Sequence, residues 1–168
     1  MQHTLRAMAS FAQRAADAFG GLLFLSLFAV FVVQIGARFG LNQPLPWTDE
    51  MAVVLYLWVI LWASAFMVPA REHVVFDLVW NSVSKPVRRF MKIVGNLMIG
   101  GLALVAIPAS WDYVHFMNRE KTPVLDIPFM WVFLPFVLLL ISLVVRSVWN
   151  IWCALKGEGL DIQEGVLL

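Results

Sequence analysis

The sequence IPFMWVFLPFVLLLISLVV, residues 127–145, contains no Asp, Glu, Lys, Arg or His along its 19 residues. Three more stretches, residues 18–37, 51–70 and 93–111, share this property. A helix rises about 1.5 Å per residue, so each stretch is long enough to cross the roughly 30 Å hydrocarbon core of a bilayer. A spanning helix also satisfies its own backbone hydrogen bonds inside lipid. The sequence therefore predicts an all-α integral membrane protein with four transmembrane helices.

The composition agrees with this class. The chain is 61% hydrophobic and 14% charged, whereas ordinary soluble domains have about 25% charged residues. The net charge of +1 gives no reason to expect a nucleic-acid partner. The single cysteine, Cys153, excludes an intramolecular disulfide and a metal site built from several thiolates. No Gly-rich phosphate loop, nucleophile elbow or zinc-protease signature occurs, so we expect no enzyme.

Ionisable side chains at membrane depth are costly and usually mark a pathway for ions or protons. None of the four stretches holds an acidic, basic or histidine side chain, so we expect a membrane protein that supports the chemistry of a partner. Among the three histidines, His73 and His115 are predicted on opposite sides of the membrane, and no two have the spacing of metal ligands. We therefore expect no haem, no metal site and no other cofactor in this chain.

Lysine and arginine residues predict the orientation, because cytoplasmic segments of membrane proteins carry more of them. The segment before the first stretch, the connection between the second and third, and the segment after the fourth hold nine; the two other connections hold three. We therefore expect both termini in the cytoplasm, with residues 146–168 as a cytoplasmic tail of one membrane domain, residues 1–168. The first apolar stretch is too long for a signal peptide and is expected to remain as a span.

Two segments outside the four stretches show the pattern of amphipathic helices. They are residues 1–17 and residues 72–90, and the second has an apolar face that includes Phe76, Trp80 and Val83. We expect both to lie in the plane of the membrane on the cytoplasmic side, either on lipid headgroups or against a partner subunit. For the first segment, the alternative is a simple extension of the first span.

The segment 72–90 has two further features. Pro86 is expected to interrupt or kink its helix, because proline lacks an N–H and collides with the preceding turn. Four cations on and beside its polar face also fit anionic lipid headgroups. These cations are Lys85, Arg88, Arg89 and Lys92.

The connections on the other side of the membrane are short, covering residues 40–50 and 112–126. Thr48 is expected to cap the second transmembrane helix, with Asp49 and Glu50 in its first turn, where carboxylates favour the helix dipole. Glu50 lies next to water at the start of this span. We therefore expect it to have a structural or interface role rather than to carry protons.

Several residues within the spans have more than one interpretation. Gln34 is a lone polar residue near the end of the first span, expected either to hydrogen-bond across helices or to reach the interface. Trp58 and Trp62 share one face at mid-span and are expected to pack on a neighbouring protein or to face lipid. Three glycines of the third span allow close approach of a neighbouring helix. They are Gly95, Gly100 and Gly101.

The segment Pro46-Trp47-Thr48-Asp49-Glu50, followed by a span and then by Arg71-Glu72-His73-Val74-Val75-Phe76-Asp77, resembles a known pattern. In the small membrane subunit of tripartite ATP-independent periplasmic (TRAP) transporters, a Trp-x-x-Glu precedes the second span. A basic residue and a His-hydrophobic-x-hydrophobic-Asp motif follow that span. The later Thr122-Pro123-Val124-Leu125-Asp126-Ile127-Pro128 is similar to the family as well. One departure is Ala63-Ser64-Ala65, where the family often shows glycine.

The resemblance implies a function. In this family a soluble periplasmic protein delivers an organic acid to a large membrane subunit, which carries the substrate and sodium sites. The small subunit, in the bacterial inner membrane, braces the fixed scaffold of that partner while a transport domain moves past it. No substrate or ion residue is therefore assigned to this chain, and its two short connections are where the binding protein is expected to touch it. The candidates for subunit contact or local architecture are Trp47, Asp49, Glu50, Arg71, His73, Phe76, Asp77, Trp80 and Val83.

Two other classes of protein compete with this interpretation. A self-sufficient small transporter or channel, working as a homo-oligomer, predicts a titratable or hydrophilic path across the membrane, and the four stretches offer almost none. A small membrane enzyme or electron carrier predicts paired histidines at one depth, which the positions of the histidines oppose.

Overall fold

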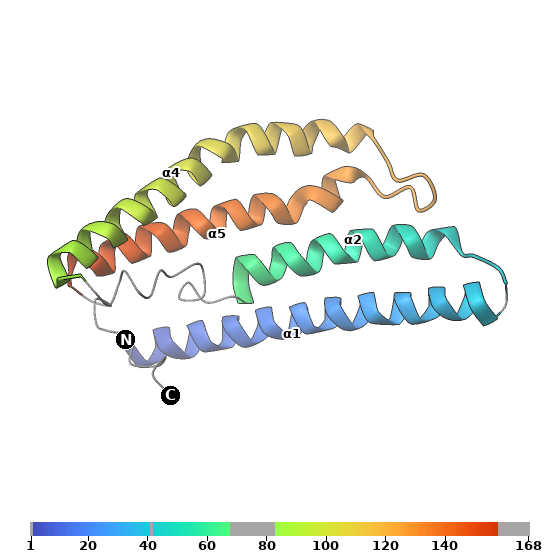
Figure 1. The fold of residues 1–168 in the computed structure, drawn as a ribbon, viewed down its shortest axis with the longest axis horizontal. Helices are drawn as coiled ribbons and strands as arrows, with labels where there is room; N and C mark the ends of the chain where they lie inside the picture. Colours follow the sequence, from blue (N-terminus) through green and yellow to red (C-terminus); the bar gives the residue numbers. More distant parts are fainter. Residues whose placement is uncertain (1, 41, 68–82, 158–168) are drawn as a thin grey trace. The chain divides into compact units, whose positions relative to one another are not determined.

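The computed structural model describes residues 2–40, 42–67 and 83–157, with side chains from residue 10 onward. Four long helices follow one another along the chain (Figure 1). They are α1 (Gln2–Ile35), α2 (Pro46–Trp62), α4 (Lys85–Phe116) and α5 (Phe129–Leu155). A π-helical turn extends α1 over Gly36–Gly40, and another extends α2 over Ala63–Met67. A short 3-10 turn, Met117–Arg119, follows α4.

All four helices are long and apolar enough to cross a membrane, which confirms the predicted all-helical class with four candidate spans. Two of the helices are much longer than their charge-free stretches, with 34 residues in α1 and 32 in α4. At 1.5 Å per residue these two measure about 50 Å, against a hydrocarbon core of about 30 Å. Each therefore continues past the hydrocarbon on at least one side. The cytoplasmic placement of the termini stays a prediction.

The two segments expected to lie in the membrane plane are only partly described. Residues 2–17 form the first half of α1 without a break, the arrangement that the alternative of an extended first span describes. Residues 72–82 lie outside the described residues, and the segment from Lys85 to Phe90 already belongs to α4. In-plane placement stays a prediction for both segments.

Pro86 lies at the start of α4, directly after the non-helical Val83 and Ser84; its effect on a helix over residues 72–90 stays a prediction, because residues 72–82 lie outside the described residues. Pro86 is the second residue of α4 and lies within its first turn. The N–H groups of a first helical turn have no partner inside the helix, so a proline there removes no hydrogen bond, and its fixed backbone angle suits a helix start. Pro86 therefore helps to begin the third span's helix.

The chain divides into two compact units, each described here by itself. The first unit comprises residues 1–67 and 109–139, and in it α1 and α2 run side by side in opposite directions (Figure 1). The indole N–H of Trp62 donates a hydrogen bond to the carbonyl of Ala16 across this pair, with an N···O distance of 3.0 Å. The ring of Phe19 meets the Trp62 ring edge-on at 4.6 Å. Because Gly20 has no side chain, Trp62 and Met67 approach α1 closely there.

The same unit contains a second tryptophan contact, since the Trp58 indole N–H donates to the carbonyl of Trp131 on α5 at 3.1 Å. Both Trp58 and Trp62 are half-buried. The sequence left two alternatives for these tryptophans, packing on a neighbouring protein and facing lipid, and the hydrogen bonds of their indoles are neither of these. Each indole bonds to a helix of its own chain instead.

The second unit comprises residues 68–108 and 140–168, and here the first part of α4 packs against the second part of α5. A Cβ atom added at Gly100 would lie 2.6 Å from the Cβ of Ser147, so only glycine allows this approach, as the sequence predicts. Gly95 and Gly101 have open space around them. Beside the contact, the Asn150 amide donates to Oδ1 of Asn96 at 3.0 Å.

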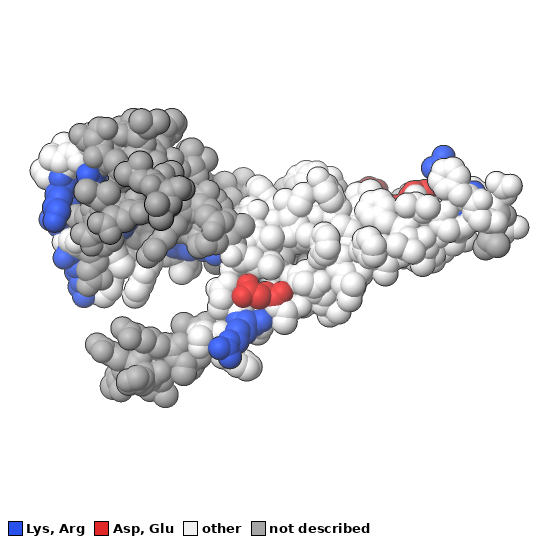
Figure 2. Space-filling view, turned by 60° about the horizontal axis from the view of Figure 1, so that its bottom comes forward, with Lys and Arg blue, Asp and Glu red and all other residues white. Residues whose placement is uncertain are grey.

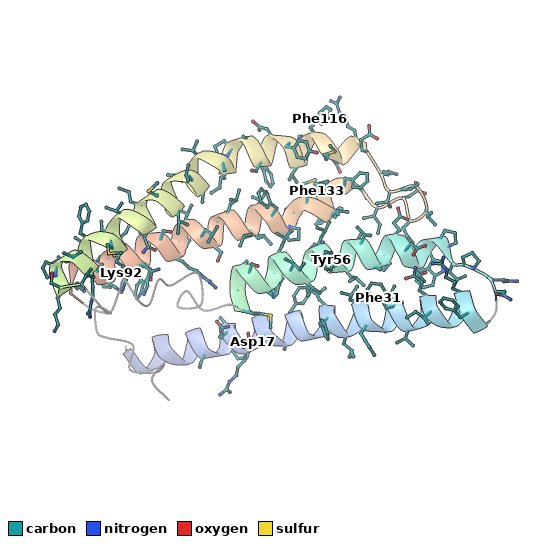
Figure 3. All side chains as sticks on the ribbon, in the orientation of Figure 1. Asp17, Phe31, Tyr56, Lys92, Phe116 and Phe133 are labelled. Carbon is teal, nitrogen blue, oxygen red and sulfur yellow. The ribbon has the colours of Figure 1, made fainter. Side chains whose placement is uncertain are left out.

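Many large apolar side chains are exposed on the chain, as Phe116 is in Figure 3. Between 6% and 22% of the residues in the most apolar window of each helix are buried within the chain. Leu102 and Val105 on α4 are 71% and 78% exposed. The greater part of the apolar surface is therefore available to lipid or to another protein.

We predict that Gly100→Ala destabilises the chain and that Gly101→Ala does not. The new methyl group at position 100 collides with Ser147 and forces the two helices apart, which typically costs about 1–3 kcal/mol. The methyl group at position 101 meets open space and serves as the matched control. Unfolding midpoints in detergent measure both effects. Equal midpoints for the two variants contradict the close approach.

Candidate functional site

The start of α2 is set by a proline. Pro46 occupies the first helical position, and Leu45 before it makes no side-chain capping bond. The expectation that Thr48 caps this helix is wrong, because Pro46 starts the helix two residues earlier. The Thr48 hydroxyl instead donates to the carbonyl of Leu45 at 2.6 Å, and its side chain is completely buried.

Glu50, in the first turns of α2, binds the loop between α4 and α5. Its Oε2 atom accepts hydrogen bonds from the backbone N–H groups of Val124 at 3.1 Å and Leu125 at 2.7 Å. Hydrogen bonds to an ionised acceptor are stronger than those between neutral groups. Both partners lie more than 70 residues away in the sequence, so this carboxylate joins distant parts of the first unit.

The loop that Glu50 holds is a compact turn with its own hydrogen bonds. Thr122 donates its N–H to the carbonyl of Ile127 at 3.0 Å and accepts the Ile127 N–H on its hydroxyl oxygen at 3.0 Å. Asp126 donates its N–H to the Thr122 carbonyl at 3.2 Å and has a positive φ of 53°. None of these bonds uses the N–H groups of Val124 and Leu125, and the Glu50 carboxylate accepts a hydrogen bond from each.

The neighbouring carboxylate, Asp49, contacts a different element. The Gln34 amide on α1 donates a hydrogen bond to Oδ1 of Asp49. This contact realises one of the two expectations for Gln34, a hydrogen bond across helices. We call the set of Gln34, Asp49, Glu50 and the loop 122–127 the α2 junction, because the start of α2 contacts both α1 and the loop there.

The α2 junction offers hydrogen-bonding groups and no reactive constellation. Its carboxylates are engaged with an amide and with backbone N–H groups. Among the residues that the structure describes, no three His, Cys, Asp or Glu side chains come together as metal ligands. The arrangement is suited to fixing the position of a loop and a helix end.

Two of the remaining candidate residues, Trp47 and Val83, lie in the part of the chain that the structure describes. Trp47, in the first turn of α2, is 38% exposed, so part of its ring is accessible at the surface of the chain. Val83 is half-buried just before α4. The other candidates lie outside the described residues, so their proposed roles stay predictions. They are Arg71, His73, Phe76, Asp77 and Trp80.

Sequence reasoning did not identify the partners of these residues. Nothing local indicates that Glu50 meets Val124 and Leu125, although a proline-flanked turn between two spans was visible in the sequence. The contact between Asn96 and Asn150 had a clearer signal in the sequence. Asn96 lies near the start of the third span and Asn150 just after the fourth, and two consecutive spans that run in opposite directions bring these two ends to the same side of the membrane.

Comparison with known families identifies the pattern. Residues 27–157 match the family model described as "Tripartite ATP-independent periplasmic transporters, DctQ component". The matched region begins inside α1 and ends just after α5, so it includes the α2 junction and parts of all four long helices.

Individual relatives carry similar descriptions. The chain is 30% identical over 100 residues to the sialic acid TRAP transporter permease protein SiaT of Haemophilus influenzae, covering 60% of this chain and 15% of that one. It is 30% identical over 95 residues to the C4-dicarboxylate TRAP transporter small permease protein DctQ of Rhodobacter capsulatus, covering 55% and 40%. It is 29% identical over 93 residues to the sialic acid TRAP transporter small permease protein SiaQ of Vibrio cholerae, covering 55% and 53%. The matches thus span about half or less of each relative.

We predict that Glu50→Ala exposes the loop of the α2 junction. Removing the carboxylate leaves the N–H groups of Val124 and Leu125 without their acceptor, and a hydrogen bond to a charged group contributes about 1.5–3 kcal/mol. Amide hydrogen exchange over residues 122–127 should therefore accelerate at least tenfold, roughly the effect of 1.4 kcal/mol.

The matched control is Glu120→Gln, which removes an exposed carboxylate from the same connection. We expect this variant to exchange like the wild-type chain. If Glu50→Ala leaves the exchange of these amides unchanged, the carboxylate does not hold the loop.

Proposed function

Because this chain belongs to the DctQ family, the small permease component of tripartite ATP-independent periplasmic transporters, we propose that it acts as a scaffold subunit. In this role it braces a large membrane subunit that takes up an organic acid together with sodium. A periplasmic binding protein delivers the acid. The chain itself holds neither the solute nor the sodium ion.

The family match over residues 27–157 carries this proposal. Two physical features support it. The four charge-free stretches offer no acidic, basic or histidine side chain for moving an ion or an acid at membrane depth. The four helices also leave most of their apolar residues uncovered by the chain itself, which is the surface that a subunit buried against a partner needs.

The solute is proposed only as a class. Two relatives are named for sialic acid and one for C4-dicarboxylates, and all of these solutes are organic acids. We propose the bacterial inner membrane as the location, with both termini on the cytoplasmic side, as the distribution of lysine and arginine predicts.

Reconstitution tests the proposal directly. We expect the full chain alone in liposomes to take up no radiolabelled C4-dicarboxylate or sialic acid when an inward sodium gradient is applied. We expect uptake when the large membrane subunit and the binding protein from the same source are added, and a discrete complex of the two membrane subunits on co-purification.

Two outcomes contradict the scaffold role. Uptake by the chain alone identifies a self-sufficient small transporter, the main alternative. A stable homo-oligomer that does not associate with the large subunit has the same implication.

A further variant tests the sequence-predicted amphipathic segment. We predict that replacing Phe76, Trp80 and Val83 together with serine weakens association with the large subunit and leaves membrane insertion intact, because only the apolar face of the segment changes. Association is measured as the fraction of large subunit that co-purifies with the tagged chain, and insertion as resistance to alkaline extraction. Unchanged co-purification removes this segment from the interface.

A further inference from the structure

Positive charge is concentrated in the second unit. Its described residues, 83–108 and 140–157, contain six cations and no carboxylate. A region with one sign of charge attracts counter-ions of the opposite sign. Lys and Arg side chains gather where α4 begins (Figure 2). The six cations are Lys85, Arg88, Arg89, Lys92, Arg146 and Lys156.

Two of these cations come together where α5 ends. Arg89 donates from Nη2 to the carbonyl of Leu155 at 2.5 Å, which brings its guanidinium next to the following residue, Lys156. The Lys156 ammonium lies 3.6 Å from the centre of the Trp152 ring. A guanidinium has five N–H donors, so its bond to Leu155 leaves others for an anion. Both cations are exposed, and so is Lys85 at the start of α4.

Exposed apolar and aromatic side chains adjoin these cations on both helices. Trp149 and Trp152 pack together with their ring centres 5.2 Å apart, and they are 61% and 45% exposed. On α4, Phe90 is 68% exposed directly beside Arg89 in the sequence. Exposed tryptophans next to lysines and arginines at the ends of apolar helices are typical of the boundary between hydrocarbon and headgroups.

We propose that this surface binds an anionic phospholipid, with the phosphate against a basic face made of Lys85, Arg89, Lys92 and Lys156. The acyl chains lie along the exposed apolar side chains of α4 and α5. A soluble anion satisfies only the cations, and an acidic peptide offers no apolar tail to the aromatic side chains. A phospholipid matches both parts of the surface. Figure 3 shows Lys92 on the first part of α4.

Titration with short-chain lipids tests the proposal. The full chain in a neutral detergent is titrated with dihexanoyl phosphatidylglycerol and, separately, with dihexanoyl phosphatidylcholine, which has the same tails and no net charge. Binding is followed by the tryptophan fluorescence of the chain. We expect phosphatidylglycerol to bind at least tenfold more tightly, with an affinity that falls as salt rises because exposed charges are screened.

Variants locate the binding. Lys85→Gln and Lys156→Gln should each weaken phosphatidylglycerol about fivefold, as expected from about 1 kcal/mol per cation near an anionic surface. Phosphatidylcholine should be unaffected. Because Arg89 also bonds to Leu155, Arg89→Lys is used there, and it should retain binding if charge is what matters. Arg38→Gln and Lys121→Gln remove exposed cations outside the second unit and serve as matched controls.

Three results overturn the proposal. The first is equal affinity for the two lipids. The second is an equal loss in the control variants, which indicates a general effect of net charge. The third is a preference for phosphatidylglycerol that appears only when Glu158, Asp161 and Glu164 are replaced by their amides, because the acidic tail rather than lipid then occupies the basic face.

Discussion

A polar group next to hydrocarbon has no water to bond with, and the contacts between the helices depend on this constraint. The Trp58 and Trp62 indoles donate to helix carbonyls, each of which has a second lone pair available. Asn150 donates a hydrogen bond to the side-chain oxygen of Asn96, so here two amides satisfy each other in part. Each bond joins two helices, because the partner that a side chain needs is on the neighbouring helix. The hydrogen bonds that satisfy these polar groups therefore also fix which helices pack together and in which register.

The buried residues are small, which follows from the same environment. Lipid tails are as apolar as leucine, so no hydrophobic effect drives the helices together, and packing depends on close approach. Five of the ten buried hydrophobic residues in the described part of the chain are alanines. Gly100 against Ser147 is the closest instance in the second unit. Many large apolar side chains remain exposed on the surface of the chain. In the apolar windows of the four helices, exposed or half-buried residues outnumber fully buried ones. This agrees with the proposed scaffold role, because a scaffold subunit needs apolar surface for its partner.

Local features were predictable from the sequence, and distant contacts were not. Charge-free stretches identified the four spans. Of the three glycines expected to allow close approach, Gly100 does so, whereas Gly95 and Gly101 have open space around them. The Thr48 cap was wrongly predicted, because Pro46 starts the helix two residues before Thr48. The Glu50 contact could not be predicted, since its partners are backbone N–H groups 74 and 75 residues away, and backbone groups leave no trace in the residue pattern.

The register of α4 against α5 shows why a charge-free stretch does not measure membrane depth. Ser147 packs against Gly100, so Arg146 lies at nearly the same level as that glycine. The charge-free stretch of α4 begins at Ile93, seven residues earlier, which is about 10 Å along the helix. The stretches on α4 and α5 therefore end at different levels. The half-buried Arg146 accommodates this difference if its methylene groups stay in apolar surroundings while its guanidinium extends toward the headgroups. The predicted end of the fourth span at Val145 is accordingly a change in composition and not the surface of the hydrocarbon core.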